Sequence, residues 1–408
     1  MRAFVVFALL LVLAAVTSAQ WSPAVVVPEL SSSGSDYYPF ISRDNLTFRI
    51  ASGRTDIPGS PGGWDIYQAT RTNPHSSFGP ISREPGINGS TNDLGQHIMW
   101  DELTAYAANS QTPSVGGHDI WMFTRPSPAS PWAAGTNLTQ LNSSGTDYCV
   151  TVTDDHLEMY FSRNGVLVQS TRAAITTTWS APVTVAELNT PTLPANCYMP
   201  CITGDGLTMY VANSMTGGLG GYDLYVVTRK RRGDPWGTPV HLANVNSSSS
   251  DHRPSLSPDG RQLFFSSTQP APSPLASNNV WVSYFSGLSY QNLPQIASPL
   301  LLHVTESTRR GMGYQVALSL SNNRGIPVPN VGMIPLDLDA LFLLSVQNVL
   351  PQVFANFAGA LDIHGEATAT IIIPPSLGLV GIEFYAAAIT YDVRINYITN
   401  GLVFSIHR

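Results

Sequence analysis

The chain has 408 residues, of which 43% are hydrophobic and only 12% are charged. This length and apolar content are enough for a packed core, which excludes a disordered or linker-like protein. The formal net charge is −7 and Lys230 is the single lysine. Because phosphate binding needs clustered cations, a nucleic-acid partner is excluded as well.

The N-terminus has the parts of a secretory signal peptide. Arg2 precedes an apolar run over residues 4–16, and small residues follow at 17–19. This pattern predicts that residues 1–19 are a signal peptide that is cleaved after Ala19. The apolar run is shorter than the roughly 20 residues that span a bilayer. We therefore expect a periplasmic or extracellular protein with no transmembrane segment after signal cleavage.

The next part of the chain contains internal repeats. An aromatic residue soon followed by a small residue or proline recurs at intervals of 57, 54, 47 and 57 residues. These phrases start at Trp21, Phe78, Trp132, Trp179 and Trp236. Each unit also has two acidic positions eight residues apart, and the fourth unit has a cysteine at the first of them. The pairs are Asp36 and Asp44, Asp93 and Asp101, Asp147 and Asp155, Cys197 and Asp205, and Asp251 and Asp259. A spacing kept in five copies identifies a repeated structural unit.

Each repeat is predicted to form four short strands. The first begins at the first acidic position and ends at a polar turn, as in Pro-Asp-Gly at 258–260. A β-branched and aromatic run forms the second strand, residues such as 65–71 form the third, and the aromatic phrase forms the fourth. Four strands in such a repeat are typical of a β-propeller blade. The fifth unit lacks its fourth strand, which the segment starting at Trp21 can supply. The sequence thus predicts an all-β, five-bladed β-propeller closed by the N-terminal strand, over residues 20–290.

The C-terminal part has a different pattern. Alternating runs at 314–319 and 367–373 are separated by Pro and Gly turns, and 338–350 could form one helix. We expect a small β-sandwich-like module over residues 300–408, after a linker of residues 291–299.

Two phrases carry a resemblance to a known family. They are Pro-Ser-Leu-Ser-Pro-Asp-Gly-Arg-Gln-Leu-Phe-Phe-Ser-Ser at 254–267 and Gly-Gly-Trp-Asp-Ile-Tyr at 62–67. Both resemble the WD-like repeat of bacterial exported propellers, including those of the TolB type, and the resemblance covers about residues 21–290. It implies a propeller that presents a binding surface, and it implies no particular reaction.

Strand direction predicts a face that could bind a ligand. The first acidic positions lie at the same end of the repeats as the longest loops. Three of these loops end in an aromatic ring. The residues expected on this face are Asp36, Asp93, Asp147, Asp251, Trp64, His118 and Tyr222. They suit a carbohydrate or peptide, and the carboxylates could hold a calcium ion. In the alternative interpretation the aspartates hold turns through hydrogen bonds to the backbone, and no cofactor is bound.

Catalysis is the second interpretation of this face. Five-bladed glycosidases use paired carboxylates, one of which is the general acid. The glutamates of the repeats are expected away from the loop-bearing face, so an aspartate would have to be the acid. These glutamates are Glu29, Glu84, Glu102, Glu158 and Glu187. We therefore predict an exported binding or scaffold protein that recognises a glycan, peptide or envelope partner; the alternative is a glycan-active hydrolase that uses Asp residues.

The three cysteines fall in register on neighbouring first strands, with their side chains on one side. Cys197 and Cys201 would lie about 13 Å apart in an extended strand, too far for a disulfide. One disulfide is expected between Cys149 and either Cys197 or Cys201. A fully reduced set of buried thiols is the alternative.

Five Asn-x-Ser/Thr sequons occur in the first part of the chain. They start at Asn45, Asn88, Asn137, Asn142 and Asn246. A chain rich in Asn, Ser and Thr contains several such sites by composition alone, so the sequons do not by themselves indicate glycosylation.

Overall fold

The computed structural model describes residues 21–58, 63–189, 199–273, 275, 278–290, 294–306, 308–329, 331–399 and 401–406. The chain divides into two compact units, Ser18–Leu293 and Pro294–Arg408. The predicted signal peptide lies outside the described residues, and its cleavage stays a prediction. None of the helices in the described ranges is long and apolar enough to cross a membrane.

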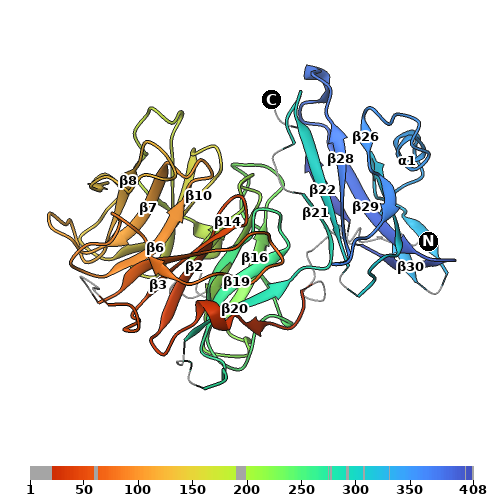
Figure 1. Ribbon diagram of the computed structural model, residues 1–408. Helices are drawn as coiled ribbons and strands as arrows, with labels where there is room; N and C mark the ends of the chain where they lie inside the picture. Colours follow the sequence, from red (N-terminus) through yellow and green to blue (C-terminus); the bar gives the residue numbers. More distant parts are fainter. Residues whose placement is uncertain are drawn as a thin grey trace, which may run out of the picture. The chain divides into compact units, whose positions relative to one another are not determined.

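The first unit is built from antiparallel sheets of four strands each (Figure 1). Within its described residues there are five such sheets, and four of them consist of consecutive strands. These are β2 (Asp36–Ile41), β3 (Thr47–Ser52), β4 (Asp65–Thr70) and β5 (Ser82–Arg83); β6 (Asp93–Ile98), β7 (Thr104–Asn109), β8 (Asp119–Thr124) and β9 (Thr136–Asn137); β10 (Asp147–Val152), β11 (Glu158–Arg163), β12 (Val166–Thr171) and β13 (Val183–Thr184); and β14 (Met199–Ile202), β15 (Thr208–Asn213), β16 (Asp223–Thr228) and β17 (Val240–His241). Short 3-10 turns follow two outer strands, at Pro28–Leu30 and Ala186–Leu188.

The fifth sheet joins the two ends of the repeat array. Its strands are β18 (Asp251–Leu256), β19 (Gln262–Ser267), β20 (Asn279–Tyr284) and β1 (Val25–Val26). The N-terminal strand β1 pairs antiparallel with β20, and Trp21 forms a further bridge with Phe285. The pairing predicted for the N-terminal segment is confirmed. It covers the edge that β20 would otherwise leave open to other chains.

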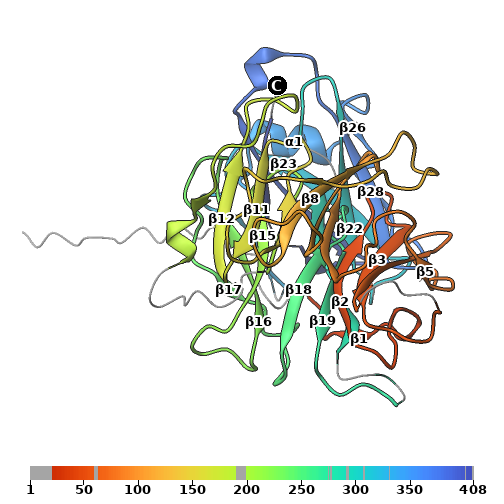
Figure 2. The same cartoon turned by 90° about the vertical axis from the view of Figure 1, so that its left-hand side faces the viewer.

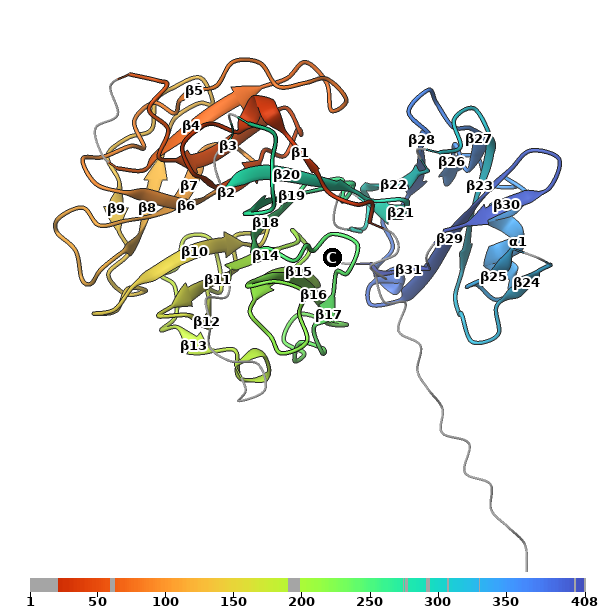
Figure 3. The same ribbon diagram turned by 90° about the horizontal axis from the view of Figure 1, so that it is seen from below.

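The innermost strands of the five sheets follow one another in a closed cycle (Figure 3). Strand β2 neighbours β6, β6 neighbours β10, and β10 and β14 lead to β18, which lies beside β2 (Figure 2). Apolar side chains fill the spaces between adjacent sheets; Phe48, Tyr67, Phe264 and Val280, for example, belong to one buried cluster. In the sections below, the loop end is the end of the sheets where Asp36, Asp93, Asp147 and Asp251 begin the innermost strands, and the turn end is the opposite one.

The aromatic phrases of the repeats form a repeated anchor at the turn end. In four sheets an arginine after the third strand lies over the aromatic ring of the phrase, 4.1–4.5 Å from its centroid. The pairs are Arg71 and Phe78, Arg125 and Trp132, Arg172 and Trp179, and Arg229 and Trp236. Each arginine also donates from Nε to a backbone carbonyl of the preceding turn. In the fifth sheet Phe285 and Trp21 take these places, with ring centroids 5.2 Å apart. The phrase therefore ties its strand to the turn by cation–π contact.

A second repeated anchor consists of asparagines that follow the fourth strands. The side-chain amide of each accepts a hydrogen bond from one backbone N–H of the third strand and donates to the carbonyl of the same residue, at 2.6–3.0 Å. The pairs are Asn88 and Ile66, Asn142 and Ile120, Asn189 and Leu167, and Asn246 and Leu224. Three of the sequons start at these asparagines. Their amide nitrogens are thus already engaged in holding the fold.

The innermost strands share a local irregularity. Strands β2, β6, β10 and β18 each have a register shift against the second strand of their sheet. The third residue of each has a positive φ, between 55° and 58°, at Tyr38, Gly95, Cys149 and Arg253. A β-bulge of this kind turns a side chain out of the regular alternation. A Cβ at position 95 would lie 3.1 Å from the Tyr38 ring, so this close approach favours the glycine found there.

In its described residues, the second unit consists of two larger sheets, a small hairpin and one α-helix. Its elements are β22 (Pro299–Thr305), β23 (Gly313–Ser319), β24 (Ile326–Val328), β25 (Gly332–Ile334), α1 (Ala340–Val346), β26 (Phe354–Ala355), β27 (Ala358–Ala360), β28 (Glu366–Ile372), a 3-10 turn at Leu377–Leu379, β29 (Glu383–Tyr391), β30 (Ile395–Ile398) and β31 (Leu402–Ser405); β21 (Gly287–Tyr290) ends the first unit. Strand β28 pairs with β22 and β26, and β29 pairs with β23, β30 and β31. Asp339 caps α1 by accepting from the backbone N–H of Phe342, as an N-cap aspartate does. The helix falls within the predicted range 338–350.

Candidate functional site

The four aspartates predicted on the loop-bearing face are buried, and each is exposed by at most 1%. Each accepts a hydrogen bond of 2.6–2.8 Å from the backbone N–H four residues earlier. The donors to Asp36, Asp93, Asp147 and Asp251 are Ser32, Gly89, Ser143 and Ser247. Arg54 and Arg163 form ion pairs with Asp36 and Asp147. This is the turn-holding arrangement, and it leaves little carboxylate surface for a ligand.

The pKa shifts of Asp36, Asp93 and Asp251 also fit the turn-holding role, because burial is their largest cause. Burial raises the pKa of Asp93 to about 7, and burial also raises the pKa of Asp36 and Asp251. Within the described ranges, no three His, Cys, Asp or Glu side chains are placed to hold a metal ion. To be bound by the four aspartates, a calcium ion would have to displace the hydrogen-bond donors that these carboxylates already have.

An aromatic row crosses three sheets at the loop end. The ring centroids of Trp64 and Tyr37 are 5.0 Å apart, and Tyr37 stacks on His252 at a centroid distance of 5.0 Å. Tyr222 contacts His252 edge-on, with the centroids 6.3 Å apart. The aromatic row consists of these four residues, Trp64, Tyr37, His252 and Tyr222. His252 is buried, and the other three are partly exposed. Two of the predicted rim residues, Trp64 and Tyr222, are thus brought into one array.

His118, the third predicted rim residue, is placed differently. Its backbone carbonyl accepts from the Asp147 N–H at 2.8 Å, and its ring is partly exposed. Burial lowers the pKa of His118. Its described ring contacts do not include the aromatic row.

Arg253 lies beside the aromatic row, next to Tyr37 and His252. Its guanidinium carbon is 4.2 Å from the Tyr37 ring centroid and 4.1 Å from that of Tyr38. Its Nη2 donates to the Tyr38 hydroxyl at 3.2 Å, and its Nη1 lies 3.5 Å from Nδ1 of His252. Tyr38 also contacts Cys149. Side chains from the first, third and fifth sheets therefore meet at one point.

Arg253 differs from most arginines of the first unit in its partners. Among the described residues, no Asp or Glu carboxylate lies within ion-pair distance of its guanidinium, and its buried Nε has no hydrogen-bond partner. Burial first, and then the Arg253 charge, hold the pKa of His252 well below its usual range. The imidazole is neutral at pH 7, so it does not add to the local positive charge. The loop end thus has aromatic rings around one uncompensated cation.

Sequence reasoning missed Tyr37, Tyr38 and Arg253, although the repeat register contained a signal. Tyr37 and His252 both directly follow the first aspartate of their repeats, and Tyr38 and Arg253 come next. Equivalent positions in a closed ring of repeats approach each other around the axis. A comparison of these two positions across the repeats would have found the cluster.

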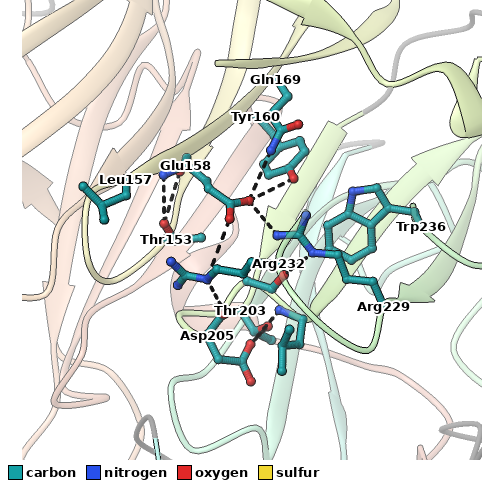
Figure 4. A network of polar contacts seen from close by, with 12 residues as sticks. Thr153, Leu157, Glu158, Tyr160, Gln169, Thr203, Asp205, Arg229, Arg232 and Trp236 are labelled. Atoms are coloured by element: carbon teal, nitrogen blue, oxygen red, sulfur yellow. Dashed lines mark hydrogen bonds and ion pairs between the residues drawn. The ribbon is translucent and has the colours of Figure 1, made fainter. Parts of the chain in front are cut away.

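Three of the glutamates, Glu84, Glu102 and Glu158, belong to charge networks at the turn end. Glu158 accepts from Arg229 at 2.6 Å, from Tyr160 at 3.1 Å and from Gln169 at 3.2 Å (Figure 4). Arg232 reaches the second carboxylate oxygen at 3.8 Å. All of these partners come from the third and fourth sheets, so the network joins two sheets.

A second network joins the first and second sheets. The buried Arg49 pairs with Glu84 at 3.0 Å and with Glu102 at 2.7 Å. Arg125 lies 2.9 Å from Glu102 and 3.6 Å from Glu84. Two cations and two anions compensate each other here, which is the arrangement that buried charges require.

The described cysteines, Cys149 and Cys201, are not bonded to each other. This excludes one of the two predicted pairings. Cys201 Sγ accepts a weak hydrogen bond from the Leu256 N–H at 3.4 Å, and burial raises its pKa to about 11. Cys197 lies outside the described residues, so a bridge from Cys149 to Cys197 stays a prediction.

No protein-family model matches the chain, and no curated protein matches it. Solved structures give distant likenesses. An α-L-arabinofuranosidase from Lactobacillus brevis is 13% identical over 66% of this chain and 95% of its own, with a TM-score of 0.43. An exo-β-1,3-galactanase from Phanerochaete chrysosporium is 9% identical over 93% and 99%, with a TM-score of 0.42. A putative TolB from Agrobacterium tumefaciens is 11% identical over 87% and 99%, with a TM-score of 0.37. Similarity at this level does not extend to activity or ligand.

Proposed function

We propose that this chain is an exported carbohydrate-binding protein, built on a five-bladed β-propeller with a C-terminal β-sandwich-like module. The ligand would bind at the loop end, in the periplasm or outside the cell. The observation that carries the proposal is the aromatic row beside Arg253. Sugar rings present C–H groups that pack on aromatic faces, while hydroxyls need a few polar partners. The row supplies the faces, and the Arg253 guanidinium supplies the polar group.

The energetics of the loop end support a binding role. The residues with positive φ at Tyr38, Cys149 and Arg253 each cost of order 1–3 kcal/mol. The bulge recurs in four innermost strands and belongs to the common architecture; at Arg253 it directs a cation towards Tyr37 and Tyr38. The turn-end networks satisfy their own charges, whereas within the described ranges Arg253 has no carboxylate partner and its Nε has no hydrogen-bond partner. A ligand with oxygen acceptors would complete its hydrogen bonding.

Glycan-array binding followed by isothermal titration calorimetry tests the proposal. We expect the mature chain to bind saccharides, and the Trp64→Ala variant to lose at least ten-fold in affinity. Trp100→Ala is the matched control, because Trp100 is 55% exposed and lies at the turn end. Absence of saccharide binding by the wild-type protein, or equal losses in the two variants, would contradict the proposal.

A glycan-active hydrolase is the second candidate, and one observation favours it. Asp93 has a pKa of about 7, raised first by burial and further by Asp65, which suits a general acid. Its 1% exposure and its bond to the Gly89 N–H fit a turn better. Release of reducing sugar by the wild-type protein, abolished in Asp93→Asn, would favour the hydrolase; binding without product release would favour the binding protein.

A further inference from the structure

The Arg253 side chain is directed by its backbone. Its φ is +56° in a strand that is otherwise extended, and the adjacent register shift lies between His252 and Ser255. A non-glycine residue in this region is uncommon and unfavourable. The bulge places the guanidinium over the Tyr37 and Tyr38 rings. Its hydrogen bond to the Tyr38 hydroxyl joins two residues that are 215 positions apart in the chain. The strained backbone therefore holds a cation at the centre of the loop end.

The guanidinium has donors to spare. It carries five N–H groups, and its described polar contacts are one bond to Tyr38 and a longer contact with His252. Neighbouring arginines at the loop end have carboxylate partners: Arg54 pairs with Asp36, and Arg163 with Asp147. The fold thus compensates those charges internally but leaves the charge of Arg253 without a counterion among the described residues.

We propose that Arg253 binds the carboxylate of an acidic saccharide whose ring packs on the aromatic row. This inference rests on the proposed function and specifies its ligand class. A planar guanidinium matches a carboxylate with two parallel hydrogen bonds. Contact with two tyrosine rings restricts the Arg253 side chain, which limits the conformational entropy that binding must remove.

The location of the site favours a saccharide over a peptide. Extended peptides usually bind by adding a strand to a sheet edge, through main-chain hydrogen bonds. The outer edges of these sheets are formed by strands such as β5 and β9, whereas the aromatic row and Arg253 lie on or beside the inner strands β2 and β18. Ring faces with one cation, away from a strand edge, suit a sugar acid.

The test is calorimetry on the mature chain with a panel of uronic-acid oligosaccharides: trigalacturonate, a glucuronate-containing hyaluronan hexasaccharide and an alginate trisaccharide. The methyl ester of each is the matched neutral ligand. We expect at least one acid to bind about ten-fold or more tightly than its ester, because a hydrogen bond to a charged group is stronger than a neutral one. This preference should weaken with added salt.

Three variants locate the charge. Arg253→Asn removes the cation but keeps a residue that accepts positive φ, and it should abolish the preference for the acid while leaving binding of the ester. Arg253→Lys should restore part of the preference, since the charge returns without the planar fork. Arg231→Asn, at an exposed turn-end position, is the control and should change nothing. The melting temperature of each variant checks that it folds.

The outcomes separate this inference from the proposed function. Equal binding of acid and ester, or a preference that survives Arg253→Asn, overturns the role of Arg253. If no acid of the panel binds while neutral glycans bind in a Trp64-dependent way, the inference fails and the proposed function stands. If no saccharide binds at all, both fail. Tighter binding of a tripeptide with a free C-terminus than of any sugar acid, lost on amidation, overturns the saccharide assignment.

Discussion

The two ends of the repeat sheets treat charge differently. At the turn end, Arg49, Arg125 and Arg229 are buried in networks that contain glutamates, and arginines lie over aromatic rings that are themselves buried. At the loop end, Arg253 lies over the partly exposed ring of Tyr37 and the buried ring of Tyr38, with no carboxylate partner among the described residues. The same pair of groups, a guanidinium and an aromatic ring, is therefore charge-compensated at one end and not compensated within the described chain at the other.

The difference separates structural from functional sites in a repeat protein. Elements repeated in nearly every sheet, such as the arginine over the aromatic phrase, hold the common architecture. The position of Tyr37 is also tyrosine in two other repeats, at Tyr148 and Tyr198, whereas the histidine and arginine at His252 and Arg253 occur at these positions in the fifth repeat alone. Departure from the repeat, together with incomplete charge compensation, is the reason for placing the proposed ligand at the loop end.

The largest expected effect breaks the turn-end compensation. Arg49→Met removes one of the two cations that Glu84 and Glu102 share and leaves the buried network with one uncompensated negative charge, so we expect a loss of about 3–5 kcal/mol in the free energy of unfolding. Arg43→Met is the matched control: Arg43 pairs with Asp154, but both side chains are about 30% exposed, and its loss should cost about 1 kcal/mol or less. Urea unfolding measures both. Similar losses would show that burial of the network does not matter.

The second prediction contrasts carboxyls at the two ends by their pH dependence. Asp93, at the loop end, has a pKa of about 7, against 3.8 for the ordinary side chain, because it is buried. Its ionisation is thus unfavourable in the folded state, and the stability present below pH 3.8 is lost as the pH rises through 7. Relative to Asp93→Asn, the wild-type free energy of unfolding should fall by up to roughly 4 kcal/mol between pH 4 and 8.

Asp155, at the turn end, should show the opposite slope. Burial tends to raise its pKa, but hydrogen bonds from Thr153 and the charge of Arg232 outweigh burial and lower it below 3.8. Its stabilisation is therefore present above pH 3.8 and is lost as the pH falls through the lowered pKa. Urea unfolding of wild type, Asp93→Asn and Asp155→Asn across pH 3–8 checks both signs. Parallel curves for the three proteins would refute the contrast.

A third prediction concerns the structural part of the loop end. Asn142 accepts from the Ile120 N–H at 2.8 Å and donates to the Ile120 carbonyl at 3.0 Å. Asn142→Asp keeps the acceptor but removes the donor, and it should cost about 2 kcal/mol because a backbone carbonyl loses its partner. Asn73→Asp is the control: Asn73 only accepts from the His75 N–H in an exposed turn, and we expect a change within about 0.5 kcal/mol. Thermal unfolding distinguishes the two.

The sequence predicted the elements that depend on local spacing. The eight-residue separation of the acidic positions placed the first strands and their turns, and the missing fourth strand of the fifth repeat predicted the pairing of Val25 and Val26 with β20. These features follow from strand periodicity and turn chemistry, which act over a few residues.

The candidate site depends on contacts that local patterns do not contain. Arg253 and Tyr38 meet only because the ring closes, and both point there because a bulge reverses the regular alternation of their strands. The four aspartates also show that local sequence patterns do not contain such contacts. Their type and spacing suggested an acidic surface, but burial and the N–H groups of Ser32 and its equivalents assign them to turns. Burial is a property of the closed ring and not of the repeat.

The smallest expected effect on stability tests whether the aromatic row serves the fold at all. Trp64 is partly exposed and its ring contacts Tyr37 at the surface of the loop end, so Trp64→Ala should cost about 1 kcal/mol or less. Trp132, at the turn end, is 4% exposed, lies under Arg125 and donates to Glu84 at 2.9 Å; Trp132→Ala should cost about 3–5 kcal/mol. Urea unfolding of the two variants compares the ends directly. A large loss for Trp64→Ala would mean that the row is a packing element, and the reason to expect a ligand there would fall away. A small loss means that the protein keeps Trp64 beside Tyr37 at little benefit to its own stability, which is what a binding surface requires.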